Sequence, residues 1–160
     1  MDLKTTDLCD QYTSEAVVCE DIFTSFGGKK RFSGPIVTIR VFEDNVLVRK
    51  MIETVPAGTV LVVDGGGSKR CALLGDRLAA IAVERGISGF IINGCVRDTA
   101  DLGQMDIGVL ALGKTPLKSR KEGLGATGET VRFAGVDWVP GHYVYVDEDG
   151  AVLFPQKMEL

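Results

Sequence analysis

The sequence predicts a single α/β domain over residues 1–160, with a central strand–helix–strand unit and mixed sheets around it. Residues Thr59–Val63 form an apolar, largely β-branched run, which is typical of a strand buried on both faces. Residues Gly75–Arg85 then follow helical periodicity, and Gly89–Asn93 is a second apolar run. A crossover helix between two such strands makes a right-handed parallel βαβ unit.

The two other helices are predicted from spacing and from turn residues. Thr6 is expected to cap a short helix that carries Leu8 and Tyr12. Apolar residues have helical spacing within Asn45–Glu53, and Pro56 lies just beyond that helix and ends it. In the central helix we expect one face to hold the residues Leu78, Ile81, Ala82 and Arg85, with Gly86 at its C′ position.

Further strands are predicted on both sides of the central unit, Ile107–Leu112 as a third apolar run and the others from alternation of apolar and polar residues. They are Gly34–Glu43, Ile107–Leu112, Thr130–Phe133, Asp137–Val139, His142–Val146 and Ala151–Phe154. Asp149-Gly150 is the expected hairpin turn between the last two strands. Cys71–Leu74 is too short to classify.

Composition excludes several classes of protein. The net charge of −4 argues against nucleic acid as a direct partner, because phosphate binding needs a concentrated cationic face. The four cysteines form no CxxC pair and His142 is the single histidine, so a zinc site is not expected. We expect the cysteines to be small buried hydrophobes of a reducing compartment. The sequence shows no secretory signal and no apolar run that could span a membrane, which predicts a cytoplasmic protein.

Two polar clusters are expected to meet at one edge of the sheet. The glycine-rich segments Gly65–Gly67 and Gly94 are expected to leave the carboxyl ends of neighbouring strands, where open α/β sheets bind ligands. Gly75-Asp76 opens the central helix, and its free amides make an anion site. Arg97-Asp98 follows the next strand along the chain.

These residue types suit the binding of an anion and a metal ion, although each residue also has a purely structural interpretation. Arg97 can pair with a carboxylate or stabilise an enolate oxygen. Asp98 and Asp101 are hard oxygen ligands suited to Mg²⁺ or Mn²⁺. Alternatively, Asp76 is a stabilising charge in the first helical turn, and Arg97 and Asp98 form a loop salt bridge.

Other motifs do not support a site. Gly65–Arg70 resembles a phosphate loop but lacks the GxxxxGK[ST] spacing, and it also lacks the GxGxxG register of a dinucleotide site. No Ser–His–Asp arrangement is visible, and we expect a structural role for His142. Lys69 and Lys114 have no evident context that would lower a lysine pKa for Schiff-base chemistry.

Long blocks of the chain resemble the RraA-like family. They are LCDQY, FTSFGGKKRFSGPIVTIRVFEDN, VLVVDGGGSKRCALLGD, NGCVRDTADL, DIGVLALG and VYVDEDGAVL. That family includes regulators of ribonuclease E activity and metal-dependent 4-hydroxy-4-methyl-2-oxoglutarate aldolases. The resemblance implies a swivelling β/β/α-type domain that assembles as trimers or pairs of trimers.

The resemblance to the aldolase branch also implies roles for individual residues. Asp98 would anchor Mg²⁺ or Mn²⁺, partly through water. The amides of Gly75, Asp76, Arg77 and Leu78 would bind the carboxylate of a 2-oxo acid substrate. Arg97 would steady the enolate, and Asp76 could orient a water that removes the hydroxyl proton of the substrate. Oxaloacetate decarboxylation is expected as a second activity, because it needs the same enolate without that base.

A second hypothesis comes from the regulator branch. This chain is similar to that branch in its length and in its FEDN and DGGGS blocks. The regulator archetype replaces the aspartate after the arginine, whereas this chain has Asp98. The alternative function is therefore a non-catalytic protein that binds and inhibits an RNase E-type endonuclease. Its acidic character would suit a basic partner segment.

Overall fold

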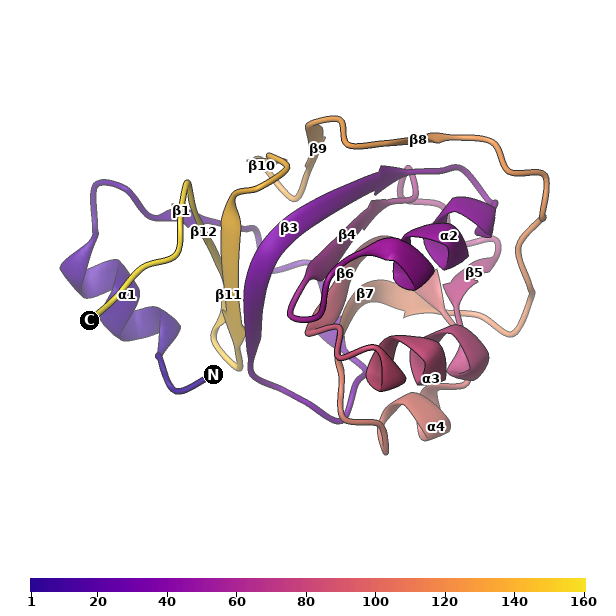
Figure 1. Cartoon of the computed structure of the whole chain (residues 1–160), viewed down its shortest axis with the longest axis horizontal. Coiled ribbons are helices and arrows are strands. Elements are labelled where there is room, and N and C mark those ends of the chain that lie inside the picture. Colours follow the sequence, from indigo (N-terminus) through magenta and orange to yellow (C-terminus); the bar gives the residue numbers. More distant parts are fainter.

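The computed structural model describes residues 1–160 and has three layers (Figure 1). The helices are α1 (Thr5–Gln11), α2 (Val46–Thr54), α3 (Asp76–Glu84) and α4 (Thr99–Leu102). The strands are β1 (Val17–Val18), β2 (Thr24–Ser25), β3 (Phe32–Arg40), β4 (Val60–Asp64), β5 (Ala72–Leu74), β6 (Gly89–Val96), β7 (Gly108–Lys114), β8 (Ala126–Thr127), β9 (Val131–Phe133), β10 (Val136–Trp138), β11 (Tyr143–Asp147) and β12 (Gly150–Phe154). No helix is long and apolar enough to cross a membrane.

The main sheet is mixed, as the sequence predicts. Its strand order is β1-β12-β11-β3-β4-β6-β7-β2, with β5 beside β6 and β8 beside β3. Strands β3, β4, β6 and β7 are parallel to one another, and the strands outside them pair antiparallel. The predicted βαβ unit is confirmed, because β4 and β6 pair in parallel and α3 lies between them in the chain. Helices α2 and α4 make two more crossovers, β3–α2–β4 and β6–α4–β7.

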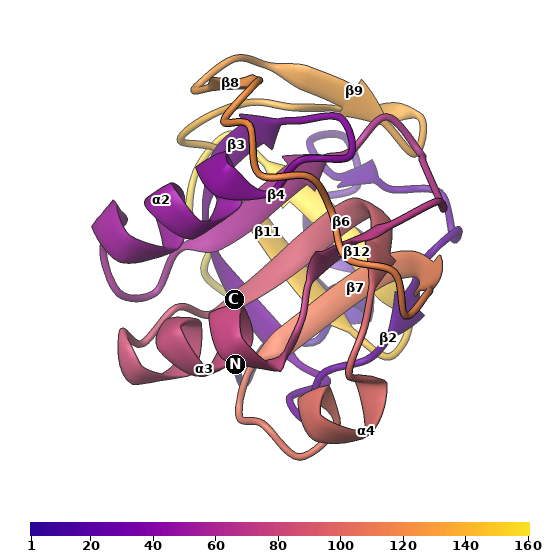
Figure 2. The same cartoon turned by 90° about the vertical axis from the view of Figure 1, so that its right-hand side faces the viewer.

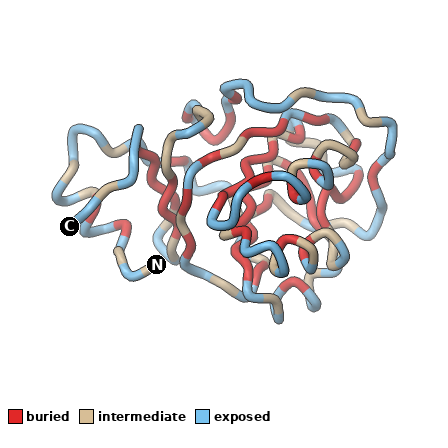
Figure 3. Tube along the Cα trace, viewed as in Figure 1, coloured by how far each residue is buried: buried red, intermediate tan, exposed pale blue.

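The two faces of the parallel strands are buried in different cores. Leu61 and Val63 of β4 pack in a core with α2, α3 and α4. Val60 and Val62 of the same strand pack in a second core with the β9–β10 hairpin and with β11 and β12. Figure 2 shows α2, α3 and α4 on one side of the sheet, and Figure 3 shows a buried interior. The β4 run is thus buried on both faces, as predicted, and the order helix layer, parallel sheet, β layer agrees with a β/β/α-type domain.

The ends of the α2 and α3 helices follow the predicted signals. Helix α2 ends at Thr54 with Val55 in an extended conformation, because the residue before Pro56 disfavours the helical region. Gly86, with φ of 75°, follows the end of α3 as the expected C′ glycine. The predicted buried face of α3 is shifted, since Ala79 and Ala82 are buried whereas Arg85 is exposed.

Other local predictions were wrong. Thr6 caps nothing: α1 begins at Thr5, its N-cap residue Lys4 makes no side-chain cap, and Thr5 instead donates to Asp147 from its amide (2.8 Å) and its hydroxyl (2.7 Å). Gly94 lies inside β6 and does not leave its end. The unclassified segment before Gly75 holds β5, a short strand that pairs with the end of β6.

The last two strands form the expected hairpin with a shifted turn. Asp147 pairs with Gly150, so Glu148 and Asp149 form the tip and Gly150 begins β12. Among the cysteines, Cys19, Cys71 and Cys95 are buried free thiols and Cys9 is half-buried. Burial is the main cause that raises the pKa of the Cys19 thiol to about 12, which keeps it protonated.

Candidate functional site

The carboxyl ends of β5 and β6 bring the two predicted clusters into contact. β5 leads directly into Gly75 and α3, and β6 leads directly into Arg97 and Asp98. The pairing continues past the strands, because the amide of Arg97 donates to the carbonyl of Leu74 at 2.9 Å. The Arg97–Asp98 turn is thereby fixed against the start of α3.

Asp98 caps helix α3 from a different part of the chain. Its Oδ2 accepts a hydrogen bond from the amide of Asp76 at 3.0 Å, while the N-cap residue Gly75 has no side chain to do so. The amides of Arg77 and Leu78 donate no hydrogen bond within the chain. The helix therefore presents free N–H groups and the positive end of its dipole beside the Asp98 carboxylate.

Asp98 itself has a backbone conformation that is uncommon for a residue with a side chain. Its φ of 57° and ψ of 43° lie in the left-handed region, and it is also the N-cap residue of α4. Such residues are found preferentially at functional sites, where the surrounding structure holds them in place. Here the hydrogen bonds from Asp76 to the side chain and from Leu102 to the carbonyl (2.9 Å) hold Asp98.

Gly75 is required by close approach and not by its backbone angles. A Cβ atom placed there would lie 2.6 Å from Oδ2 of Asp98 and 3.3 Å from both Cγ and Nε of Arg97. Its φ of −133° is one that any residue can adopt. The glycine lets both side chains of the turn pack against the helix start.

Arg97 and Asp98 do not form the loop salt bridge of the purely structural interpretation. Five ion pairs are present, and none includes Arg97, Asp98 or Asp101. The half-buried Arg97 side chain donates no hydrogen bond, and Oδ1 of the exposed Asp98 accepts none. A free guanidinium and a free carboxylate oxygen thus lie beside unpaired helix amides, which suits an anionic ligand that also binds a cation.

The remaining predicted residues are less closely involved. Arg77 is exposed, and the side chain of Leu78 packs on the core, so that only its amide is available. Asp101 is exposed in the first turn of α4, and its carboxylate makes no contact with the cluster by hydrogen bond or ion pair. The Asp76 carboxylate likewise makes no hydrogen bond with Arg97 or Asp98.

The residues present fit a weakly coordinated divalent cation but not a metal cage. No group of three or more His, Cys, Asp or Glu side chains converges in the structure. Mg²⁺ commonly keeps several waters and binds one or two carboxylates together with substrate oxygens. Asp98, whose Oδ1 accepts no hydrogen bond, offers one such carboxylate ligand.

One further polar cluster is present in the fold that the sequence analysis did not predict. Glu43, with φ of 57°, accepts hydrogen bonds from Ser68 (2.7 Å) and Arg70 (2.5 Å). These bonds, first that of Ser68 and then that of Arg70, are the main causes that lower the pKa of the Glu43 carboxyl. This cluster ties the loop after β4 to the end of β3. The sequence shows acidic and basic residues in these two loops, but no spacing pattern indicates that they contact each other.

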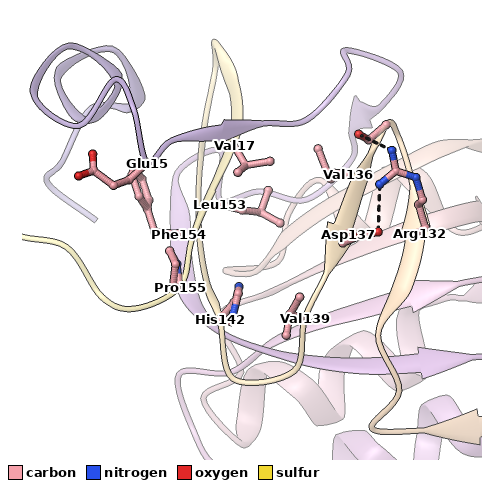
Figure 4. Close-up of a pocket in the computed structure, with 11 residues that line it drawn as sticks. Glu15, Val17, Arg132, Val136, Asp137, Val139, His142, Leu153, Phe154 and Pro155 are labelled. Carbon is pink, nitrogen blue, oxygen red and sulfur yellow. Dashed lines mark hydrogen bonds and ion pairs between the residues drawn. The ribbon is translucent and has the colours of Figure 1, made fainter.

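His142 lies in a different region. It lines a cavity of about 300 Å³ between β1, β12 and the β9–β10 hairpin, at the opposite end of the molecule from Gly75 (Figures 1 and 4). This cavity is therefore separate from the candidate site.

The comparisons with known proteins find relatives over nearly the whole chain. The model of the RraA-like family, described as Aldolase/RraA, matches residues 5–153. A candidate 4-hydroxy-4-methyl-2-oxoglutarate aldolase of Bacillus cereus is 55% identical over 97% of this chain and 98% of its own length. A second one, of Halorhodospira halophila, is 51% identical over the whole of both chains.

Two solved structures carry other names. One from Geobacillus kaustophilus HTA426, described as an S-adenosylmethionine:2-dimethylmenaquinone methyltransferase, has a TM-score of 0.96 and 61% identity, covering 98% of this chain and 97% of its own. The RNA-processing inhibitor RraA from Thermus thermophilis has a TM-score of 0.95 and 48% identity, covering 99% and 96%. The fold and the comparisons together lead to one conclusion: this chain is a member of the RraA-like family.

Proposed function

We propose that the protein is a divalent-metal-dependent aldolase that cleaves 4-hydroxy-4-methyl-2-oxoglutarate and related 2-oxo acids to pyruvate. The observation that carries the proposal is the Asp98 carboxylate capping α3 beside the unpaired Arg97 guanidinium. The names of relatives that are 55% and 51% identical over nearly the whole chain support the same substrate class. Oxaloacetate decarboxylation is proposed as a second activity.

The chain's residues have distinct roles in this proposal. The free amides of Arg77 and Leu78 bind the substrate carboxylate at the positive end of α3. Asp98 holds Mg²⁺ or Mn²⁺, which when bound supplies Lewis-acid stabilisation of charge on the 2-oxo oxygen. Arg97 stabilises the same developing charge through its planar, two-donor guanidinium.

The proposed reaction is a retro-aldol cleavage. Asp76 orients a water that accepts the proton of the C4 hydroxyl, the C3–C4 bond breaks, and its electron pair forms the enolate of pyruvate. C4 becomes the keto carbon of one pyruvate, and protonation of the enolate at C3 gives the other. In oxaloacetate the same bond breaks with loss of CO₂, so no hydroxyl proton has to be removed.

Pyruvate release, coupled to NADH oxidation by lactate dehydrogenase, tests this function. We expect turnover with Mg²⁺ or Mn²⁺ and none in excess EDTA. Full activity in EDTA, or none with either metal, would contradict the proposal.

A second candidate function fits the 48% identity to the Thermus RNA-processing inhibitor, although the aldolase names of the relatives favour the first. In that case the protein binds an RNase E-type endonuclease without catalysis, and neither metal nor Asp98 is needed. Asp98→Asn separates the two, because it removes the aldolase activity and leaves ribonuclease inhibition intact.

Assembly and location stay predictions. We propose a trimer or a pair of trimers in the cytoplasm, without direct binding to nucleic acid. Phe42, Leu117 and Leu124 support assembly, because these large apolar side chains are half or more exposed in the single chain.

A further inference from the structure

Strand β1 leaves an open edge at the end of the sheet opposite the candidate site (Figure 1). Val17 pairs with Leu153 and Val18 with Val152 in antiparallel register, and the amide of Cys19 donates to Ala151 at 3.1 Å. Hydrogen bonding alternates along an antiparallel ladder. The backbone N–H and C=O groups of Val17 and Cys19 therefore point toward β12, and those of Val18 point toward the open edge. Both valine side chains are exposed, by 46% and 61%.

A cavity lies beside this edge on each face of the sheet. The cavity of about 300 Å³ includes Val17 and Leu153, which share one face as a register pair. A second cavity, of about 250 Å³, includes Val18 and Val152, which share the other face. Successive residues of an added strand point to opposite faces, so neighbouring side chains would enter different cavities.

The two cavities differ in chemistry. The first has an aliphatic and aromatic part that includes Val136, Leu153 and Phe154, and Glu15, Asp137 and His142 also line it (Figure 4). Its one guanidinium, Arg132, is already engaged by Asp137 at 3.0 Å and by the carbonyl of Gly135 at 3.3 Å.

The second cavity is acidic. It is lined by Asp10 and Asp149, neither of which is in an ion pair, and it has no basic residue. An aliphatic side chain therefore suits the apolar part of the first cavity, and a basic one suits the second.

We propose that β1 is the docking edge for an extended segment of a partner protein in which aliphatic and basic residues alternate. The segment adds to the sheet through main-chain hydrogen bonds to Val18, and the cavities select its alternate side chains. Two copies of this chain are a poorer match, because their acidic edges would repel each other. This interaction does not depend on the proposed catalytic function, which lies at the other end of the sheet.

The probe is a fluorescent seven-residue peptide of alternating Lys and Val, titrated with the full chain at low salt. We expect it to bind about tenfold more tightly than a peptide of the same composition with its lysines and valines in two blocks. An alternating Glu and Val peptide should not bind. Equal binding of the blocked peptide would mean simple charge attraction and would overturn the proposal.

Val18→Pro is the sharpest variant, because it removes an N–H that the ladder to β12 does not use. We expect it to weaken peptide binding by about tenfold, whereas Val18→Thr, which keeps the N–H, changes it by less than about twofold. Asp10→Asn with Asp149→Asn should also weaken binding, and Asp106→Asn, in the loop between α4 and β7, is the matched control for charge. Unchanged binding by Val18→Pro would refute strand addition.

Hydrogen exchange of the unmodified protein gives a readout that needs no variant. Saturating peptide should slow exchange of the Val18 amide by about tenfold or more, because that amide becomes hydrogen-bonded. Binding without protection of Val18 would contradict the proposal. A concentration-dependent dimer that Val18→Pro abolishes would identify a second copy as the occupant and would also overturn it.

Discussion

Replacing Gly75 by alanine tests whether catalysis needs Asp98 in its observed place. The new Cβ would lie 2.6 Å from Oδ2 of Asp98, where ordinary contacts begin at 3.4 Å. The carboxylate must therefore withdraw by about 0.8 Å, and a misplacement of about 1 Å can cost about 10²-fold in rate. We expect kcat for pyruvate release to fall by about 10- to 100-fold.

The folding cost of the same change should be small, because Asp98 is an exposed side chain that can move. Losing the cap hydrogen bond to Asp76 should cost about 1 kcal/mol. For a chain of this size that lowers Tm by about 3 °C. The φ of −133° at this position adds no strain for alanine.

Gly113→Ala is the matched control, at the end of β7 on the same edge of the sheet. Its Cβ would meet only the Cys95 Sγ, at an ordinary 3.6 Å. The assay measures initial rates of pyruvate release with Mg²⁺ and thermal unfolding by circular dichroism for both variants. Activity of Gly75→Ala within about threefold of the unmodified protein would refute the reasoning, since the two clusters would then not form one site.

Four further predictions follow from individual residues and from the assembly. Asp98→Asn should abolish turnover with nearly unchanged Tm, because asparagine can still accept the Asp76 hydrogen bond and tolerates a positive φ; a large loss of Tm would make Asp98 structural. Arg97→Lys should lower kcat by about 10²–10³-fold with a smaller effect on KM, because lysine lacks the planar fork; kcat within about threefold would contradict that role. Burial would raise the pKa of Asp147, but hydrogen bonds from Thr5 and Asp149 outweigh burial and lower that pKa. The resulting stabilisation is complete above the pKa of about 4 in the unfolded chain and is lost as pH falls through the lower pKa of the folded protein. The Tm deficit of Asp147→Asn should therefore shrink below about pH 4, and a deficit independent of pH would contradict this reasoning. Light scattering at micromolar concentration should give a trimer or hexamer, and a monomer would count against assembly.

Much of the fold could be predicted because its elements are encoded locally. The two-faced burial of Thr59–Val63 follows from an unbroken apolar run, and the ends of α2 and α3 follow from Pro56 and Gly86. The position of β5 could not be predicted, because three residues are too few to show a period. The Thr6 cap failed for a related reason: Thr5 finds a partner in Asp147, far away in the sequence, and no local pattern reveals it.

The sequence by itself singled out the residues that we propose for the chemistry: Gly75-Asp76 after one strand and Arg97-Asp98 after the next, with roles implied by the resemblance to the RraA-like family. Only the tertiary structure decided how they meet. The Asp98 carboxylate caps α3 because β5 and β6 pair in parallel and end together, which also makes Gly75 obligatory. The same holds for β1, whose open edge and two cavities depend on pairing with β12 at the far end of the chain. Contacts of this kind depend on strand order and register, which local periodicity does not encode.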